Sequence, residues 1–171
     1  MKFELTPRRV FAGLALIPLA LLAEGLILQH LQGLAPCPPC ILQREGFFLF
    51  ALIALAAAIH NPRRGGAALY AGAMALAALA GLGVAILQVW ALHHPKFGCG
   101  IDVMEQFVNN LPMAKLLPFI FHASGECSAP HDPILGLMVP EWSLAWFSVL
   151  FLAAVFFAFK WLMAAPARAA A

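Results

Sequence analysis

The fold is decided by the stretch Pro36-Cys37-Pro38-Pro39-Cys40-Ile41-Leu42-Gln43-Arg44-Glu45, which lies between two long apolar segments. The stretch therefore begins at a membrane surface and runs into the second apolar segment. Two cysteines separated by two residues can close a small disulfide or share a metal ion. Arg44, four residues beyond Cys40, falls on the same face of any helix that starts there. The stretch thus marks a candidate site at one end of a membrane-spanning helix.

The composition is that of an integral membrane protein. Hydrophobic residues make up 63% of the 171 residues and charged residues 11%, whereas a soluble domain is about half apolar and about a quarter charged. The length allows one small helical bundle, and we expect residues 1–171 to form a single membrane domain. The net charge of +2 is too small to suggest a nucleic-acid partner.

Four apolar segments, each near the roughly 20 residues that cross a bilayer, predict an all-α, four-helix transmembrane bundle. They cover approximately residues 10–28, 41–59, 67–92 and 142–162. The first could instead be a cleavable signal peptide, because basic residues precede it and Ala20-Leu21-Leu22-Ala23 could pass for a cleavage site. The run is long for a signal peptide, however, and its removal would place the next connection on the wrong side.

The basic residues predict the orientation of the bundle. Seven of the ten lysines and arginines share one side if all four segments cross; these are Lys2, Arg8, Arg9, Arg63, Arg64, Lys160 and Arg168. That side is expected to be the cytosol, with both termini in it. Cys37 and Cys40 follow the first span and Cys99 and Cys127 follow the third, so all four cysteines face the extracytoplasmic side, where disulfides persist.

The second outer connection, from about Leu92 to Glu141, is long and partly apolar. Apolar residues recur in it at helical spacing, namely Val103, Met104, Phe107, Val108 and Leu111. We expect a short amphipathic helix that lies in the membrane interface. An apolar loop packed on the bundle would occupy much the same place. In the third span, small residues such as Gly81 and Ala85 predict a face for close helix packing.

Cys40 has a favourable position for thiol chemistry. Prolines suit the start of a helix, because proline has a fixed φ and no N–H to leave unpaired. The positive end of the helix dipole favours the thiolate form of a cysteine there, and Arg44 adds a full positive charge one turn further on. Cys37, in the loop before the helix, is expected to be the more accessible partner for exchange.

Arg44 is a second candidate site residue. The purely apolar part of the second span, from Phe47 to Ile59, is about 20 Å long, whereas the hydrocarbon core is about 30 Å thick. The span must therefore draw Gln43, Arg44 and Glu45 into or against the interface, where a charge is costly and indicates function. Alternatively, Arg44 reaches the lipid headgroups or pairs with Glu24 or Glu45.

A second class of protein stays open from the residues alone. The cysteines could staple the loops of a structural bundle, or hold a metal ion. The six histidines have no metal-ligand spacing with the cysteines, and a four-cysteine zinc site usually has two close cysteine pairs. Only Cys37 and Cys40 are close in the sequence, so a metal site is weakly supported and none is assigned.

Several segments together resemble one family. They are Pro36-Cys37-Pro38-Pro39-Cys40 with the following Arg44, Leu111-Pro112-Met113-Ala114-Lys115, Ala123-Ser124-Gly125-Glu126-Cys127, and Gly136-Leu137-Met138-Val139-Pro140-Glu141-Trp142. With the four-span layout, these motifs resemble the bacterial disulfide bond formation protein B (DsbB) family over nearly the whole chain. The chain departs from the family pattern at Gln43, where many members have Glu, and at Gln88-Val89-Trp90, where members often have a His-x-Trp pattern.

The resemblance implies a thiol:quinone oxidoreductase of the bacterial inner membrane. Its partner would be a periplasmic thioredoxin-fold oxidase resembling DsbA, and its cofactor a membrane quinone, either ubiquinone or menaquinone. The implied disulfides are Cys37–Cys40 and Cys99–Cys127, with all four cysteines catalytic. The resemblance also implies that Cys40 faces the quinone and that Arg44 polarises the quinone oxygens.

Overall fold

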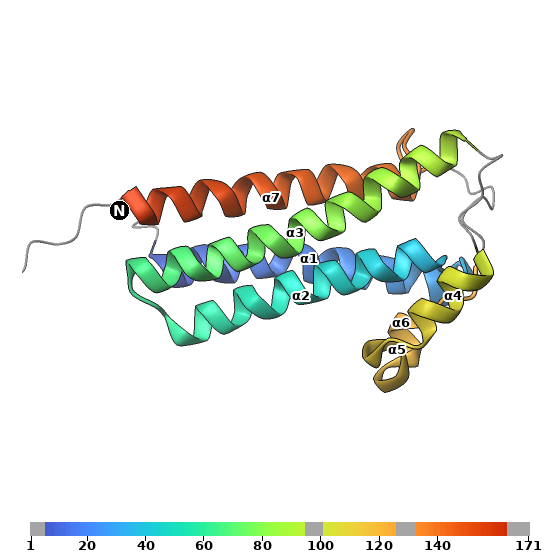
Figure 1. Cartoon of the computed structure of the whole chain (residues 1–171), viewed down its shortest axis with the longest axis horizontal. Coiled ribbons are helices and arrows are strands. Elements are labelled where there is room, and N and C mark those ends of the chain that lie inside the picture. The colour runs from blue at the N-terminus through green and yellow to red at the C-terminus, as the bar shows by residue number, and fades with distance from the viewer. Residues whose placement is uncertain (1–5, 95–100, 126–132, 164–171) are drawn as a thin grey trace, which may run out of the picture.

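Four long helices form the body of the molecule (Figure 1). The computed structural model describes residues 6–94, 101–125 and 133–163. The long helices are α1 (Pro7–Leu31), α2 (Pro38–His60), α3 (Arg64–His93) and α7 (Val139–Met163). Each is long and apolar enough to cross a membrane, and each contains one predicted span. The predicted all-α, four-helix membrane fold is confirmed.

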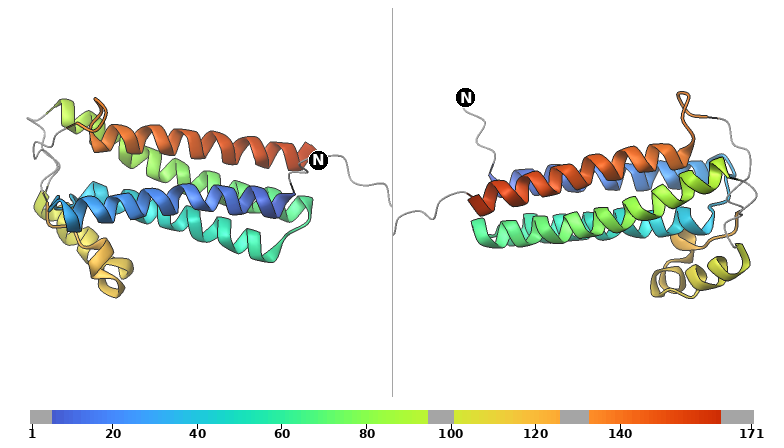
Figure 2. Two further views of the ribbon diagram at one scale, coloured as in Figure 1. Left: turned by 180° about the vertical axis from the view of Figure 1, so that it is seen from behind. Right: turned by 45° about the horizontal axis from the view of Figure 1, so that its top comes forward.

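The four helices lie side by side, as all the views show (Figure 2). α2 packs between α1 and α3, and α3 packs along α7. The core between them combines a few large side chains, such as Phe11, Phe50 and Phe147, with many buried alanines. On α3, Ala78 and Ala85 are fully buried, whereas Ala73 and Gly83 are exposed. The predicted packing face of α3 is therefore confirmed in part.

One end of the bundle holds the basic residues. α2 ends at His60, and Asn61 adopts a left-handed conformation (φ 46°) that lets its N–H bond to the Ala57 carbonyl. The turn is shorter than the sequence suggests, because α3 already begins at Arg64. The same end carries the start of α1 and the end of α7 (Figure 1). It therefore gathers Arg8, Arg9, Arg63, Arg64 and Lys160.

Three short helices lie at the opposite end (Figure 1). They are α4 (Ile101–Asn109), α5 (Pro112–Leu116) and α6 (Pro118–Phe121), where one amphipathic helix was predicted. Pro112 and Pro118 each begin a helix, the position at which a missing N–H costs nothing. Val108, Ala114 and Phe121 are buried against Ile41 of α2. Apolar side chains on the outer surface of these helices are exposed, namely Val103, Phe107, Leu116 and Phe119, which suits the interfacial position that the sequence predicts.

Candidate redox site

A disulfide joins the residue before α2 to the first turn of the helix. Cys37 is the N-cap residue in an extended conformation, and Pro38 and Pro39 are the first two helical residues. The Sγ atoms of Cys37 and Cys40 are bonded, with the Cα atoms 5.1 Å apart. The CxxC motif is thus a closed disulfide at a helix N-terminus, where the amide dipoles favour negative charge.

The exposure of the two cysteines is the opposite of the expectation. Cys37 is only 4% exposed, whereas Cys40 is half-buried. The expectation that Cys37 is the more accessible cysteine is wrong, because its neighbours Pro36, Pro38 and Pro39 are themselves buried. Pro36 is held in place by the second outer connection, which the sequence pattern does not indicate.

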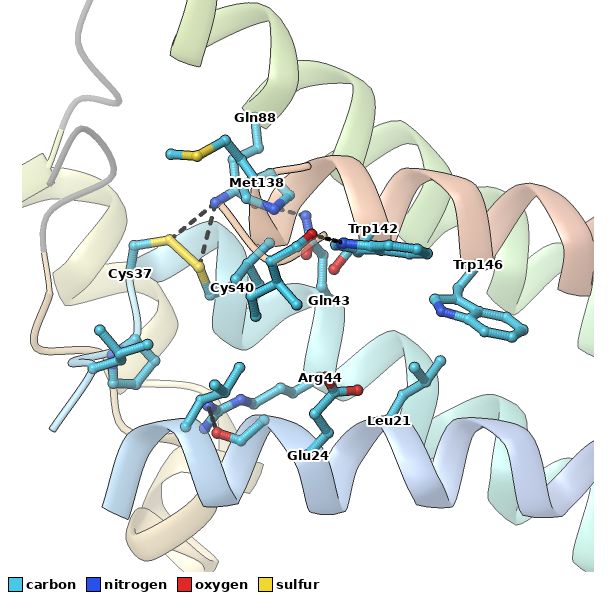
Figure 3. A pocket seen from close by; sticks show the side chains of 18 of the residues that line it. Leu21, Glu24, Cys37, Cys40, Gln43, Arg44, Gln88, Met138, Trp142 and Trp146 are labelled. Atoms are coloured by element: carbon cyan, nitrogen blue, oxygen red, sulfur yellow. Dashed lines mark hydrogen bonds between the residues drawn. A yellow bond between two sulfur atoms is a disulfide. The ribbon is translucent and has the colours of Figure 1, made fainter. Parts of the chain in front are cut away.

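A buried glutamine contacts the disulfide and is itself held by a second buried glutamine (Figure 3). Nε2 of Gln88, on α3, donates hydrogen bonds to Cys37 Sγ at 3.2 Å and to Cys40 Sγ at 3.3 Å. Oε1 of Gln88 accepts a hydrogen bond of 2.6 Å from Nε2 of Gln43, on α2. The two side chains are 3% and 4% exposed. The neutral amide of Gln88 therefore links the disulfide to α3, and the amide of Gln43 holds Gln88 in place.

Arg44 joins three parts of the chain. Its Nη1 donates hydrogen bonds to Oε1 of Gln29 and to the carbonyl of Ile120, and its Nη2 donates to the carbonyl of Gly25 at 2.9 Å. The guanidinium thus ties α2 to α1 and α6. Its partners among the described residues are neutral oxygens, so the alternative of an ion pair with Glu24 or Glu45 is not observed.

A cavity of about 290 Å³ opens beside the disulfide, between α1, α2 and the start of α7. Cys40 and Arg44 both line it, together with Cys37, Gln43, Gln88 and the carboxyl group of Glu24. Figure 3 shows Leu21, Trp142 and Trp146 on the cavity wall. The predicted pairing of Cys40 and Arg44 on one face of α2 therefore brings both side chains to one mostly apolar cavity.

A tight turn before α7 covers part of this cavity. Ile134 and Leu137 exchange two backbone hydrogen bonds of 2.9 and 3.1 Å. The indole N–H of Trp142 donates to the carbonyl of Ile134 at 2.9 Å, which fixes the turn to the first part of α7. Ile134, Leu135 and Met138 line the cavity, so the turn and the indole ring shape it together.

The second outer connection is attached to the residue before Cys37. The backbone N–H groups of Ser124 and Gly125 both donate to the carbonyl of Pro36 at 3.0 Å. The amide of Asn109 holds the preceding residue, Ala123, through two hydrogen bonds of 2.8 and 3.0 Å. The Ala123-Ser124-Gly125 motif is therefore fixed between α4 and the CxxC loop.

Two of the predicted site residues, Cys99 and Cys127, lie outside the described residues. Within the part of the chain that is described, His, Cys, Asp and Glu side chains form no group of three or more that could hold a metal ion. In the sequence, Gln43 and Gln88 stand out only as departures from a family pattern, which predicts no role for either residue. The available signal was a pair of polar amides in otherwise apolar spans.

A disulfide at the end of four membrane helices, beside an apolar cavity, defines a membrane-embedded thiol–disulfide oxidoreductase. The family model described as "Disulfide bond formation protein DsbB" matches residues 7–157. A disulfide bond formation protein B from Herminiimonas arsenicoxydans is 44% identical over 155 residues, which are 90% of this chain and 96% of the relative. One from Aromatoleum aromaticum is 45% identical over 144 residues, covering 83% and 86%. The chain belongs to the DsbB family, and it is a disulfide-generating enzyme.

Proposed function

We propose that this chain reoxidises a reduced thioredoxin-fold oxidase resembling DsbA and passes the two electrons to a membrane quinone, ubiquinone or menaquinone. One observation carries the proposal: Cys40, in a disulfide, and Arg44 line the same apolar cavity among membrane-spanning helices. A sulfur atom can thereby reach an electron acceptor that dissolves in the bilayer rather than in water.

The cavity residues fit a quinone head group. Small-molecule sites are mostly apolar, with a few polar groups that fix the orientation of the ligand. Trp142 and Trp146 supply flat apolar surface. Among the described residues, Arg44 uses three N–H groups on protein oxygens. A guanidinium has five, so two donors remain beyond these bonds for a carbonyl oxygen. A bound quinone would supply a two-electron, two-proton acceptor beside Cys40, and Glu24 also lies on the cavity wall.

The cysteines act in successive exchange steps. A thiolate of the partner oxidase attacks Cys99 of a Cys99–Cys127 disulfide, and Cys127 leaves as a thiolate. Cys127 then attacks Cys37; the Cys37–Cys40 bond breaks, and its electron pair stays on Cys40. Each step forms one S–S bond and breaks one, so the two electrons move inward without an external oxidant. The partner's second thiolate then displaces Cys99, and the partner leaves with its own disulfide formed. Cys99 attacks Cys127 of the Cys127–Cys37 bond, so the Cys99–Cys127 disulfide is restored and Cys37 leaves as a thiolate. Cys37 and Cys40 are then both reduced, and loss of two electrons from this pair at the cavity would restore the Cys37–Cys40 disulfide.

The attachment of Gly125 to Pro36 supports the second exchange step. Gly125 N lies 3.0 Å from the Pro36 carbonyl oxygen, and Pro36 directly precedes Cys37. Cys127 follows Gly125 by two residues, which span at most about 7 Å of extended chain. This short tether suits a thiolate that must reach the buried Cys37.

The location follows from the same proposal. The basic end of the bundle, with Arg63 and Arg64 in its turn, lies in the cytoplasm of a bacterium, and the redox end faces the periplasm across the inner membrane. Both termini are then cytoplasmic. A membrane-impermeant thiol reagent, applied to intact spheroplasts after reduction, should label Cys99 and Cys127; labelling only after lysis would contradict this orientation.

The catalytic test uses the full-length protein in detergent with a reduced thioredoxin-fold oxidase and a short-chain ubiquinone. Quinone reduction is followed by absorbance. The wild type is expected to turn over, and Cys37→Ala and Cys40→Ala are expected to lose turnover while remaining folded. Turnover in either variant would refute the mechanism. A folded wild type without turnover would favour the alternative, a structural bundle whose disulfides only staple loops.

A spectrum gives a second, independent test of the contact between sulfur and ring. Quinone added to the protein, with Cys37 replaced by Ala so that Cys40 is free, should produce a new visible absorption band. Further replacement of Cys40 by Ala should abolish the band. A band that persists without Cys40 would place the quinone elsewhere.

A further inference from the structure

We propose that Gln88, oriented by Gln43, is a positioning residue that raises the reduction potential of the Cys37–Cys40 pair by donating a hydrogen bond to the sulfur that becomes a thiolate. The inference deepens the proposed function, because it assumes that this disulfide is the one that is opened and closed. It concerns the thiol chemistry alone and needs neither the quinone nor the partner oxidase.

The orientation of the Gln88 amide follows from its neighbours. Disulfide sulfurs carry lone pairs and no hydrogen, so a side chain that faces them must present a donor. Gln88 presents its NH2 group to both sulfurs, at 3.2 and 3.3 Å. The bond of 2.6 Å from Gln43 Nε2 occupies the Gln88 oxygen. Because buried polar groups are rarely left unpaired, Gln43 keeps the nitrogen of Gln88 directed at the sulfurs.

The same donor matters more once the disulfide opens. When an incoming thiolate bonds to Cys37 Sγ, the old S–S bond breaks and a full negative charge forms on Cys40 Sγ. A hydrogen bond to a charged acceptor is roughly twice as strong as one to a neutral acceptor. The Gln88 N–H groups are already in place, so no reorganisation is needed when the charge appears. The donor therefore stabilises the reduced pair more than the disulfide, which makes the pair more oxidising.

The position of Cys40 adds to the effect. Cys40 is the third residue of α2, whereas Cys37 is only its N-cap. The positive end of the α2 dipole favours negative charge near Cys40. Gln88 contacts both sulfurs at nearly equal distances, so it does not by itself favour one of them as the thiolate. The helix terminus stabilises the thiolate on Cys40, and the hydrogen bond from Gln88 adds to that stabilisation.

The test is a redox titration of the full chain in detergent, without quinone or partner. Cys99 and Cys127 are replaced by Ser so that only the inner pair titrates against a dithiothreitol buffer. Gln88→Leu is expected to favour the disulfide about tenfold, which lowers the potential by about 30 mV for a two-electron couple. The control Gln106→Leu alters an exposed glutamine on α4 and should leave the potential unchanged.

Two variants of Gln43 test whether it acts through Gln88. A carboxylate at position 43 has no hydrogen to donate, so in Gln43→Glu the Gln88 NH2 group must turn away from the sulfurs. This variant should lower the potential at least as much as Gln88→Leu does, because the added negative charge also disfavours a thiolate nearby. In a double-mutant cycle, Gln43→Leu should add no further shift once Gln88→Leu is present. If Gln43→Leu shifts the potential by the same amount with and without Gln88→Leu, Gln43 acts on the potential independently of Gln88.

An unchanged potential in a folded Gln88→Leu protein would overturn the inference. Folding is checked by thermal unfolding of the oxidised protein. If Gln88→Leu does not fold, Gln43→Glu decides the matter, because it keeps the Gln88 amide and the side-chain volumes; an unchanged potential there overturns the inference too. If Gln88→Leu shifts the potential but the wild-type protein does not reduce quinone, the proposed function is refuted and the inference about Gln88 stands.

Discussion

The ring of Phe147, on α7, lies directly against the backbone of Gly81 on α3. A Cβ atom built on Gly81 would lie 2.2 Å from Phe147 Cε1 and 2.3 Å from Cζ. The other side of the ring stacks on Phe47 of α2, with ring centroids 4.0 Å apart. Phe147 is fully buried, so its ring has no space into which it can move. This contact locks three of the four long helices together on the membrane side of the redox site.

Gly81→Ala should therefore destabilise the bundle by about 1–3 kcal/mol, the usual cost of overpacking a tight core. Thermal unfolding in detergent measures the change. Gly83→Ala is the matched control, because a Cβ there meets nothing within 4 Å and alanine is the better helix former. Equal stabilities of the two variants would mean that α3 and α7 are not packed as closely as the structure describes.

Gly125→Ala should slow the transfer of electrons between the two cysteine pairs. A Cβ at this position would lie 2.1 Å from the carbonyl oxygen of Ala35, so the connection must move away from Pro36. We expect quinone reduction by the reduced partner to fall at least about tenfold, because small misplacements of reacting groups are costly.

The control for this variant is Ser124→Ala, which keeps the backbone N–H that bonds to Pro36 and should retain the wild-type rate. The rate is measured as single-turnover reduction of quinone after the protein is mixed with the reduced partner oxidase. A wild-type rate for Gly125→Ala would show that the attachment to the CxxC loop is not needed for exchange.

Arg44→Lys should lose both stability and quinone affinity. A lysine ammonium is a compact charge without the planar fork of arginine, so it cannot reach Gln29, Gly25 and Ile120 together. We expect the free energy of unfolding to fall by about 2–3 kcal/mol and the KM for quinone to rise. Arg63→Lys, at the opposite end of the bundle, should change neither quantity. A variant that loses stability but keeps its KM would assign Arg44 a structural role only.

Trp142→Phe should weaken quinone binding through the turn at Ile134. The change removes the indole N–H that bonds to the Ile134 carbonyl and leaves that oxygen only its bond from the Leu137 N–H. The loss of one hydrogen bond costs about 0.5–1.5 kcal/mol and frees the turn from α7. Trp146→Phe makes the same reduction of ring size on the cavity wall, but its indole donates no hydrogen bond within the described residues. Quinone titration should show the larger rise in Kd for Trp142→Phe; the reverse order would contradict a role for the turn.

Hydropathy and charge were enough to predict the membrane helices. Each apolar run became one long helix, because in a bilayer a helix satisfies its own backbone groups. The CxxC motif after Pro36 located the disulfide, and the spacing of Cys40 and Arg44 on one helix located the cavity wall. These features are local in the sequence, so a pattern of residues is sufficient to find them.

The remaining parts of the site depend on contacts between distant segments. The hydrogen bond between Gln43 and Gln88 joins residues 45 positions apart, and that from Arg44 to Ile120 spans 76. The rotation of each helix about its axis decides whether such side chains meet, and span boundaries carry no information on rotation. The burial of Cys37 was missed for the same reason, because Gly125 and Pro36 meet only in the folded chain.

The burial of Cys37 implies that the client protein and the electron acceptor are recognised by different parts of the molecule. Cys37 is only 4% exposed, so a folded partner has little access to its sulfur, and in the proposed mechanism Cys37 does not itself discriminate among soluble proteins. In the proposed mechanism, the outer connection then determines which client protein is oxidised, and the cavity beside Cys40 and Arg44 determines which electron acceptor is used. The two specificities can be altered one at a time, and grafting the outer connection of a relative onto this bundle should change the client but leave the acceptor as it was.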